Sequence, residues 1–501
     1  MKLVLKHKVE ISLLFIFIAV YFLLRLPNLT LQPIFADEAI YIRWAQVMKS
    51  EPTLRFLPLS DGKTPLFMWA MMPLFKIFED PLFAGRFLSI ISGLFTLAGV
   101  SALSWKVFGK KVAFWASLIY IVVPYTVFFD RMALVDSMLA AFTIWGIYFA
   151  IYLAQSPRLD LAMILGFILG GGILTKTPGM INLLLIPLSI LAFKKEKIKQ
   201  HSFIKLITFW VVTVGIAFIM YNLLRLGPNF HLLSSRNADY IFAPLELVGR
   251  PLDPFIPHLR DISDWFPKLL TWPILIIGGI GMVWTLKSRN KLGILVLLWM
   301  LVPLLLSMTF LRTFTARYLL SSIPLFLILV GFGLVRIFEK VKLSYLWKIL
   351  ISLIIILPYA LLFDYQLITN PPPTFLPKAE RIGYFEEWTA GYGFKDISKY
   401  LLDRKKQGSV VVGTEGFFGT LPDGLQIYLD KANIPIIGST ASISAQIREA
   451  SLENQTFFVA NKSRFMEHIN GLKLIREYPK AKREDGSQDA IQLFEVVGEN
   501  D

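Results

Sequence analysis

Residues 292–310 read LGILVLLWMLVPLLLSMTF, a run of nineteen residues without a single charged side chain. At a rise of about 1.5 Å per residue, a helix of this length crosses a hydrocarbon core about 30 Å thick. Comparable runs recur from the N-terminus to about Asp364, and we expect about eleven membrane-spanning helices. The sequence therefore predicts an α-helical polytopic membrane protein. The expected spans lie near residues 11–26, 85–105, 112–129, 133–154, 160–176, 178–193, 204–224, 268–286, 292–310, 318–335 and 346–363.

The composition of the 501-residue chain agrees with this reading, because 55% of the residues are hydrophobic and only 17% are charged. The formal net charge of +15 belongs to the apolar part of the chain, since the residues after Asn370 contain 16 basic and 18 acidic side chains. Basic residues in short loops between spans are typical of cytoplasmic loops, so this charge does not indicate nucleic-acid binding. The chain has no cysteine, which excludes disulfide bonds, thiolate metal sites and a cysteine nucleophile.

The distribution of basic residues predicts the topology. The first span, Ile11 to Leu26, has no small-residue cleavage site after it, so we expect a retained helix and not a signal peptide. The two spans between residues 160 and 193 are equally compatible with a re-entrant pair, which leaves the orientation of later segments unchanged. With a cytoplasmic N-terminus, residues 28–81, 225–265 and the tail are external. The cytoplasmic loops then contain Lys106, Lys110, Lys111, Arg158, Lys194, Lys195, Lys197, Lys199, Lys205, Lys287, Arg289, Lys291, Arg336, Lys340, Lys342 and Lys348.

The tail differs in character from the rest of the chain. It begins with the stiff run Pro371 to Pro373 and then alternates short strand-like and helical runs. We predict a soluble α/β domain over residues 370–501, attached to a membrane domain over residues 1–365. The break predicts an accessory module whose removal leaves a folded membrane core. The expected strands are Ser409 to Gly413, Ile434 to Gly438, Thr456 to Ala460, Lys473 to Tyr478 and Ile491 to Val497.

The first external loop contains FADEAIYIRWAQVMKS, residues 35–50. An apolar stripe at helical spacing runs along it, formed by Ile40, Trp44, Val47 and Met48, and predicts an amphipathic helix lying along the outer leaflet. Asp37 and Glu38 stand at its start. One interpretation is structural, with Asp37 as the helix cap and Glu38 favouring the positive end of the dipole. The other is a general base held at the membrane surface.

Two further charged residues lie near predicted external membrane ends. Lys63 precedes a proline-fixed turn in DGKTPLFMW, where a lysine either extends its ammonium group to the membrane surface or pairs with a lipid phosphate. Asp136 lies about one turn inside the next apolar span. A carboxylate at that depth is costly in lipid, so we expect it to face a polar cavity and to be functional.

Five strings occur in register over residues 1–365: DEAIYIRWAQ, KTPLFMW, GRFLSIISGLFTLAGVSAL, RMALVDSMLAAF and RYLLSSIPLFLILVG. Together they resemble the type C glycosyltransferase (GT-C) superfamily, in the branch of protein O-mannosyltransferases and lipid A aminoarabinose transferases. The resemblance implies a multi-helix membrane fold with an external catalytic cavity, a polyprenyl-phosphate sugar donor and inversion at the anomeric carbon. It also implies that Asp37 and Glu38 match the Asp-Glu pair of the family, Lys63 its lysine and Asp136 its second carboxylate.

The chain departs from the family pattern at two positions beside Lys63. The usual Lys-Pro-Pro is Lys63-Thr64-Pro65, and the glutamate that helps to hold a metal in aminoarabinose transferases is Gly62. This argues against the same zinc site. The second external loop still offers His231 and His258 as possible ligands of a divalent metal, although a single histidine is more often a polar surface residue.

Glycosyl transfer needs a base for the acceptor hydroxyl or amine and cations for the departing phosphate. Asp37, Glu38 and Asp136 are the candidate catalytic carboxylates. The acceptor is left open between protein, lipid and glycan. The alternatives are a transporter or lipid flippase, or a membrane scaffold presenting the tail, but the polar residues gather externally and no internal repeat is evident. The candidate phosphate-binding cations, each equally an interfacial anchor, are Lys63, Arg131, Arg225, Arg312 and Arg317.

The predicted topology places the N-terminus inside the cell and residues 370–501 outside. Protease added to right-side-out vesicles of verified orientation is therefore expected to remove the tail. A tail that stays protected in such vesicles would contradict the topology and the external location of Asp37, Lys63 and Asp136.

Overall fold

The computed structural model describes residues 8–193, 200–250, 252–440, 442–465 and 471–497. The basic residues Lys194, Lys195, Lys197 and Lys199, used above for the topology, lie outside this part of the chain. Two compact units are present. The helical unit comprises Met1–Pro27, Thr53–Phe67 and Phe87–Thr369, and the α/β unit comprises Asn28–Pro52, Met68–Arg86 and Asn370–Asp501. Much of the predicted loop 28–81 thus belongs to the same unit as the tail.

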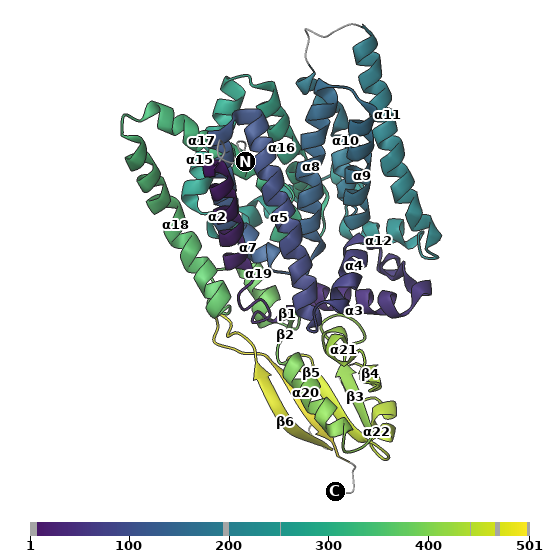
Figure 1. Cartoon of the computed structure of the whole chain (residues 1–501). Coiled ribbons are helices and arrows are strands. Elements are labelled where there is room, and N and C mark those ends of the chain that lie inside the picture. The colour runs from purple at the N-terminus through teal and green to yellow at the C-terminus, as the bar shows by residue number, and fades with distance from the viewer. Residues whose placement is uncertain (1–7, 194–199, 251, 441, 466–470, 498–501) are drawn as a thin grey trace. The chain divides into compact units, whose positions relative to one another are not determined.

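Every predicted span overlaps a helical segment of the helical unit (Figure 1). Among the described residues, five helices are long and apolar enough to cross a membrane, namely α5, α8, α11, α16 and α18, or up to seven if two bent pairs each count as one span. The pair α6–α7 bends by 58° and α14–α15 by 113°. The chain is a multi-pass membrane protein. By helix length and composition alone, five to seven spans qualify among the described residues, compared with about eleven predicted.

The helices of this unit have the following bounds: α2 (Lys8–Arg25), α5 (Pro81–Phe108, whose first six residues belong to the α/β unit), α6 (Lys110–Val122), α7 (Pro124–Asp130), α8 (Val135–Gln155), α9 (Leu159–Thr175), α10 (Gly179–Leu184), α11 (Gln200–Asn222), α12 (Leu232–Tyr240), α13 (Pro244–Val248), α14 (Phe255–Leu269), α15 (Trp272–Lys287), α16 (Lys291–Phe310), α17 (Ile323–Lys340) and α18 (Tyr345–Thr369). The 3-10 segments include η2 (Leu57–Asp61), η4 (Ile186–Ala192) and η7 (Ala316–Leu319), and α4 (Leu66–Met71) continues from this unit into the next.

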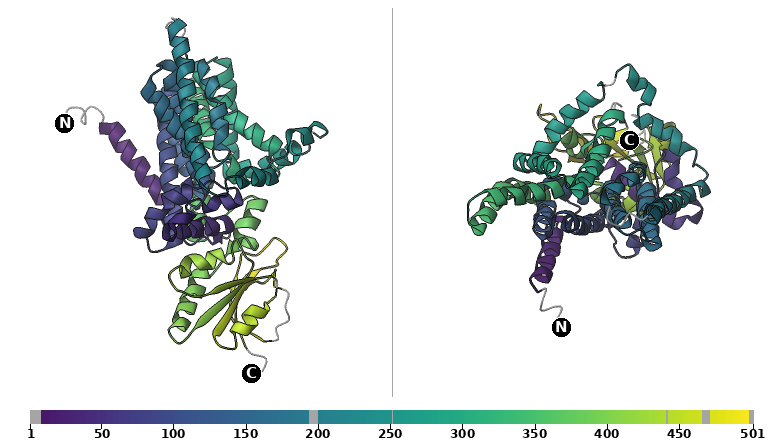
Figure 2. Two further views of the ribbon diagram at one scale, coloured as in Figure 1. Left: turned by 90° about the vertical axis from the view of Figure 1, so that its right-hand side faces the viewer. Right: turned by 90° about the horizontal axis from the view of Figure 1, so that it is seen from above.

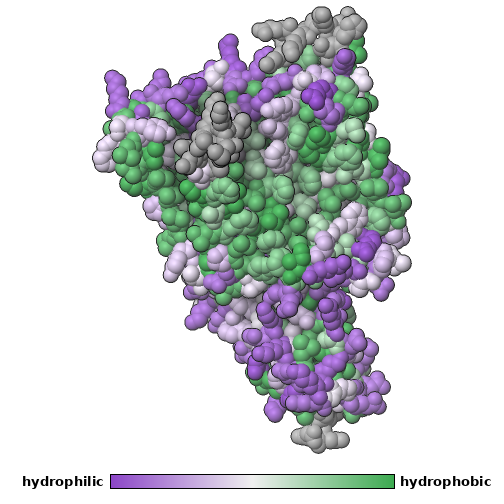
Figure 3. All heavy atoms as spheres, in the orientation of Figure 1, coloured by the Kyte–Doolittle hydropathy of each residue, from purple (hydrophilic) through white to green (hydrophobic). Residues whose placement is uncertain are grey.

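Large apolar side chains cover the outside of the helical unit (Figure 3). Val211 and Ile219 on α11 and Ile354 on α18 are each more than 60% exposed. Figure 2 shows α2 leaning away from the neighbouring helices, with Leu14 and Phe15 exposed. A water-soluble protein rarely exposes so large an apolar surface, whereas lipid tails solvate it without cost.

Inside the helical unit, α15 and α17 approach each other at two glycines. A Cβ atom at Gly281 would lie 2.0 Å from the carbonyl oxygen of Leu329, and one at Gly333 would lie 2.3 Å from that of Ile277. Small residues at these positions let the two backbones touch, as in many membrane helix pairs.

The α/β unit contains a five-stranded sheet with the order β4-β3-β5-β7-β6. Strands β4, β3 and β5 are parallel, and β7 and β6 add antiparallel to β5. All five predicted strands of the tail are confirmed within about two residues. The elements are β1 (Ile34–Phe35), α3 (Ala36–Ser50), η3 (Met72–Lys76), α19 (Lys378–Arg381), η8 (Ile382–Glu386), β2 (Ala390–Gly391), α20 (Phe394–Lys405), β3 (Val410–Glu415), α21 (Asp423–Leu429), β4 (Ile436–Ser439), α22 (Ala445–Ala450), β5 (Gln455–Asn461), β6 (Leu472–Pro479) and β7 (Ala490–Val496).

Burial explains the strand pattern. All six residues of β3 are buried, as expected for a parallel strand covered on both faces. One face of the sheet packs Ile447 of α22 against Phe458 of β5 and Phe494 of β7. These contacts place the hydrophobic core of the unit between the sheet and its helices.

Residues from the N-terminal third complete this unit. Strand β1 pairs with β2 through Ile34 and Phe35, and the Gln46 amide on α3 donates to the carbonyl oxygen of Ile427 on α21 over 2.8 Å. Cutting at Pro371 to Pro373 would therefore remove partners of β1 and α3. That such a truncation leaves a folded membrane core stays a prediction, but residues 28–52 and 68–86 would lose their partners from the tail.

The structure corrects the interpretation of α3 as a helix lying in the outer leaflet. Ile40, Trp44 and Met48 of the predicted stripe are at most 6% exposed, and Trp44 lies beside the Phe418 ring of the same unit. The stripe is covered by protein and is not available to lipid. Helical spacing identified the buried face, but it did not reveal what covers that face.

Asp423, the first residue of α21, makes the stability of the α/β unit depend on pH. Burial raises the pKa of its carboxyl group to about 6, and a hydrogen bond from the Gly419 amide and the nearby Arg43 oppose the rise. Because the folded form holds the proton more tightly than the unfolded form, stability falls as pH rises from about 4 to about 6.

Asp423→Asn removes this titration and keeps an oxygen for the Gly419 amide. Relative to wild type, the variant is expected to gain about 2–3 kcal/mol of stability between pH 4 and pH 7. Thermal unfolding of the full chain in neutral detergent measures the difference at each pH. A difference between the two proteins that stays constant across this range would contradict the prediction.

Candidate active site

The buried ion pair between Glu38 and Arg86 organises the start of α3. Both side chains are fully buried, and the Arg86 Nε and Nη2 atoms lie 2.9 and 2.8 Å from the two carboxylate oxygens of Glu38. The Glu38 Oε2 atom also accepts the backbone N–H of Phe35 over 3.0 Å. In this structure the carboxylate that caps the helix is thus that of Glu38, whereas the sequence pattern suggested Asp37.

Arg86 also holds the loop before α3. Its Nη1 atom donates to the carbonyl oxygens of Leu29 and Gln32, and its Nη2 atom donates to that of Pro33. With every donor group of the guanidinium engaged, residues 29–38 are fixed around one cation. Our sequence reasoning did not single out Arg86. The signal for it was an arginine at the beginning of an apolar run, where a counterion is required.

Asp37 lies next to Glu38 in the first turn of α3 and is half-buried. The N-terminal end of the helix dipole favours the ionised form of a carboxylate at this position. Glu38 fixes the backbone at the start of α3, so the Asp37 side chain is attached to a rigid helix end. That combination suits a group that accepts a proton.

In the helical unit, Asp136 begins α8 and forms an ion pair with Lys176. The Lys176 Nζ atom lies 2.6 Å from Asp136 Oδ1, and Asp136 is 4% exposed. The second oxygen, Oδ2, has no hydrogen-bond partner within the described part of the chain. The expectation that this carboxylate has polar surroundings fits the ion pair, although the sequence did not identify Lys176, which follows α9, as the partner.

Tyr318 on η7 joins a second cation to this pair. The Lys176 Nζ atom lies 3.9 Å from the centre of the Tyr318 ring, and the buried Arg317 guanidinium lies 5.3 Å from the same centre. Asp136, Lys176, Arg317 and Tyr318 form what we call the Tyr318 cluster. It contains two cations and one carboxylate, so it can bind an anion.

Lys63 follows a tight turn at the end of η2. Its Nζ atom lies 3.2 Å from Asp61 Oδ2, and the other oxygen of Asp61 binds Arg236 over 2.8 Å. Gly62 between them has a φ of +67°, and a Cβ atom there would lie 2.4 Å from the Cβ of Arg236. A glutamate at position 62 would therefore be strained and would clash, which gives a physical reason for this departure from the family pattern.

The remaining predicted cations occupy other surroundings. Arg131 is buried, and its Nη1 atom donates to the carbonyl oxygens of Arg25 and Pro27. Arg312 forms a two-pronged ion pair with Glu246, at 3.0 and 3.2 Å. Arg225 is exposed and lies 4.9 Å from the Phe230 ring centre. Arg317, which was also predicted for phosphate, lies against the same Tyr318 ring as Lys176, the partner of Asp136.

A second buried ion pair joins Arg25 to Asp130, the residue before Arg131. The sequence did not predict this pair either. Asp130 Oδ2 accepts the Arg25 Nε–H over 3.0 Å, and Asp130 Oδ1 accepts the Ser137 hydroxyl over 3.0 Å. Tyr21 and Tyr120 contact the same carboxylate. The network ties α2, α6, α7 and α8 together. Helix α8 also carries Asp136 of the Tyr318 cluster.

The two histidines do not form a metal site in the described residues. His258 is buried, its Nδ1 atom lies 2.8 Å from the carbonyl oxygen of Met308, and its ring stacks on Phe314. His231 is exposed. No group of three or more His, Cys, Asp or Glu side chains arranged to hold a metal occurs in the part of the chain described.

Known proteins are similar to this chain in sequence over one region and in fold over most of its length. The model of the dolichyl-phosphate-mannose-protein mannosyltransferase family matches residues 62–224. The fold is similar to ArnT from Cupriavidus metallidurans bound to undecaprenyl phosphate, with a TM-score of 0.59, 14% identity and 98% of each chain covered. The apo form of that protein gives a TM-score of 0.58 at the same identity and coverage.

A third similar structure is the archaeal oligosaccharyltransferase AglB from Archaeoglobus fulgidus, in complex with an inhibitory peptide and a dolichol-phosphate. Its TM-score is 0.56 at 12% identity, over 91% of this chain and 70% of that one. No curated protein sequence matches the chain. The chain thus matches the family model over residues 62–224 and shares the fold of these solved structures.

The burial of Glu38 and Arg86 makes a strong prediction about stability. Glu38→Gln leaves the Arg86 guanidinium buried without a counterion, and such a change typically costs about 3–5 kcal/mol. The variant is expected to unfold at a clearly lower temperature than wild type. Thermal unfolding of the purified protein in detergent measures this loss.

The matched control is Lys378→Gln, which breaks the exposed pair of Lys378 with Glu484 in the same unit. Exposed ion pairs contribute about 0–1 kcal/mol, so this variant should unfold near the wild-type temperature. Equal losses in the two variants would show that the Glu38–Arg86 pair does not have the structural weight assigned to it.

Proposed function

We propose that the protein is a membrane-embedded inverting glycosyltransferase that moves a sugar from a polyprenyl-phosphate donor to an acceptor hydroxyl or amine. The observation that carries the proposal is the shared GT-C fold over 98% of this chain and of a protein solved with undecaprenyl phosphate bound. The match of residues 62–224 to the mannosyltransferase family model supports it. These residues include Lys63, Asp136 and Lys176.

The chemistry of the transfer explains why carboxylates and cations are needed together. The acceptor oxygen or nitrogen attacks the anomeric carbon of the sugar while the bond from that carbon to the phosphate oxygen breaks. The acceptor loses its proton to a base, and the polyprenyl phosphate departs with the bonding electron pair. Cations placed at the departing oxygen stabilise the negative charge that develops there.

We assign the base to Asp37. It is a half-buried carboxylate in the first turn of α3, and the dipole of that helix favours its ionised, proton-accepting form. Glu38 is a positioning residue, because both of its oxygens are engaged by Arg86 and Phe35. Its full burial makes it unsuited to exchanging protons with an acceptor.

We assign the phosphate to Lys63 and to the cations of the Tyr318 cluster. Lys63 is about a quarter exposed, and its partner Asp61 also binds Arg236. Asp136 is a positioning residue that holds the Lys176 ammonium group over the Tyr318 ring. In this assignment Asp136 orients a cation and does not accept the proton of the acceptor.

The proposal includes an orientation in the cell membrane. The N-terminus is cytoplasmic and residues 370–501 are external, as the basic loops indicate. The donor lipid then stays in the outer leaflet with its chain in the hydrocarbon, and the acceptor arrives from outside. The acceptor is a hydroxyl or amine of a protein, a lipid or a glycan.

The decisive variant is Asp37→Asn, which keeps the size of the side chain and removes its basicity. Turnover is expected to fall by about a hundred- to ten-thousand-fold, with folding and donor binding unchanged. A transfer assay on purified protein, with matched thermal stability and donor occupancy, measures this. Near-normal turnover in the variant would remove Asp37 from the mechanism.

Lys63→Ala separates the two assigned roles. A phosphate contact is present in the bound donor as well as in the transition state, so its loss weakens donor binding in addition to slowing transfer. The Asp37→Asn variant should lower turnover alone. If Lys63→Ala bound donor as tightly as wild type, the phosphate assignment of Lys63 would be wrong.

A further inference from the structure

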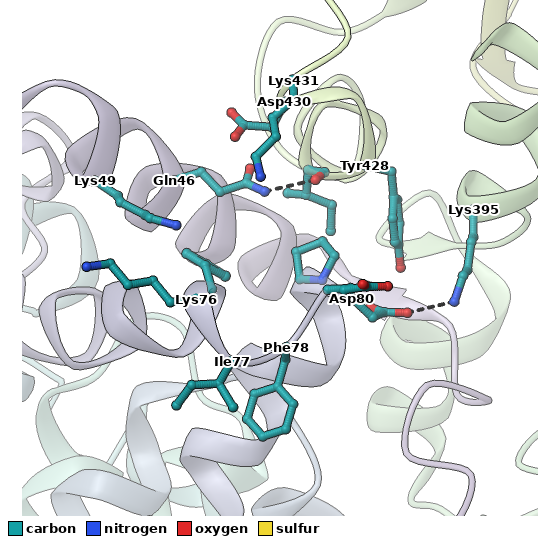
Figure 4. Close-up of a pocket in the computed structure, with 14 residues that line it drawn as sticks. Gln46, Lys49, Lys76, Ile77, Phe78, Asp80, Lys395, Tyr428, Asp430 and Lys431 are labelled. Carbon is teal, nitrogen blue, oxygen red and sulfur yellow. Dashed lines mark hydrogen bonds and ion pairs between the residues drawn. The ribbon is translucent and has the colours of Figure 1, made fainter.

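A large pocket lies within the α/β unit, and its lining includes none of the residues assigned above. Its volume is about 730 Å³, which is in the range of ligand-binding pockets in proteins. The end of α3, residues 75–81 and the end of α21 form its walls, together with Lys395 of α20 (Figure 4). Lys49, on its wall, lies twelve residues after Asp37 on α3, which corresponds to about 18 Å along the helix.

Two of the three acidic side chains on the pocket wall already have partners. Asp80 forms an ion pair with Lys395, 2.8 Å long, and Asp430 forms one with Arg43. Glu79 is the third and is exposed. The carboxylates therefore neutralise little of the remaining positive charge on the wall.

Three lysines on the wall, Lys49, Lys76 and Lys431, have no ion pair recorded among the described residues. Figure 4 shows Lys49, Lys76 and Lys431 among the side chains that line the pocket. The Lys49 ammonium group lies 5.7 Å from the centre of the Phe75 ring, which holds it at the pocket. The pocket thus has a local excess of cations.

Neutral groups on the wall add one donor and an apolar side. Burial and the nearby Asp80 raise the pKa of Tyr428 above its ordinary value, so its hydroxyl group stays protonated and can donate a hydrogen bond. The Gln46 amide is already fixed on the Ile427 carbonyl oxygen. Ile77 and Phe78 provide apolar surface beside the lysines.

We propose that this pocket binds a phosphate-bearing ligand at a site distinct from the groups assigned to transfer. A phosphate group matches two or three ammonium groups better than a neutral sugar does, and the apolar side suits the attached glycerol or sugar carbons. The same chemistry is offered by the headgroup of an anionic phospholipid and by a phosphate-bearing acceptor in water. The inference does not require the proposed function, because it is tested by binding.

The test compares the full-length protein with its Lys49→Gln/Lys431→Gln variant. In the first arm, inorganic pyrophosphate is titrated in neutral detergent and the rise in unfolding temperature gives the affinity. In the second arm, the protein is placed in phosphatidylcholine nanodiscs with and without phosphatidylglycerol, and native mass spectrometry counts the retained phosphatidylglycerol. The control is Lys399→Gln/Lys473→Gln, which removes two exposed lysines of the same unit outside the pocket.

The pocket variant is expected to bind at least one of the two probes about tenfold more weakly than wild type, while the control binds as wild type does. A loss confined to pyrophosphate identifies a water-soluble ligand, and a loss confined to phosphatidylglycerol identifies a lipid headgroup. Unliganded unfolding temperatures equal to wild type show that the variants are folded. The proposal would be overturned if wild type bound neither probe. It would also be overturned if wild type and the pocket variant bound each probe equally well.

Discussion

Charge removed from water must be neutralised where it lies, and this constraint organises both units of the protein. Glu38 and Arg86, Arg25 and Asp130, and Asp136 and Lys176 are each paired at 3.0 Å or less. The first two pairs are almost completely buried, where an unpaired charge would cost several kcal/mol. Each pair joins segments at least 40 residues apart, so the pairs fix tertiary structure and not only local conformation.

The need to neutralise buried charge also distinguishes charged residues that stabilise the fold from those that can take part in a reaction. A carboxylate with both oxygens engaged by an arginine and a backbone amide, as in Glu38, is committed to the fold. Asp37, its neighbour, is carried on the backbone that this pair holds in place. In the helical unit, Asp136 places a lysine over an aromatic ring next to a buried arginine. The fold thus supplies rigid supports for a few ionised groups.

Local patterns in the sequence predicted much of this structure. Apolar run lengths located the helices, and alternation with turn residues located all five strands of the tail. The motifs around Lys63 and Asp136 lie in the region that the family model matches, residues 62–224, whereas Asp37 lies before it. Periodicity also found the buried face of α3 but assigned it to lipid, because a sequence does not show what covers an apolar stripe.

The sequence could not show which residues, far apart along the chain, form ion pairs with one another. Arg86, Lys176 and Arg25 are single charged residues in apolar surroundings. The residues that flank them in the sequence do not indicate which carboxylate each one binds. Whether a bent pair such as α6–α7 or α14–α15 forms one span also depends on the tertiary structure. The membership of residues 28–52 and 68–86 in the α/β unit likewise depends on tertiary pairing, such as that of β1 with β2.

The central claim is our proposal that this protein uses a polyprenyl-phosphate donor. Mass spectrometry of the lipids retained by the purified, folded protein tests it most directly, before and after incubation with a polyprenyl-phosphate sugar. The account predicts a bound polyprenyl phosphate, with or without its sugar, whose amount falls in the Lys63→Ala variant. A folded wild-type protein that retains no such lipid and takes up none when it is supplied would contradict the account.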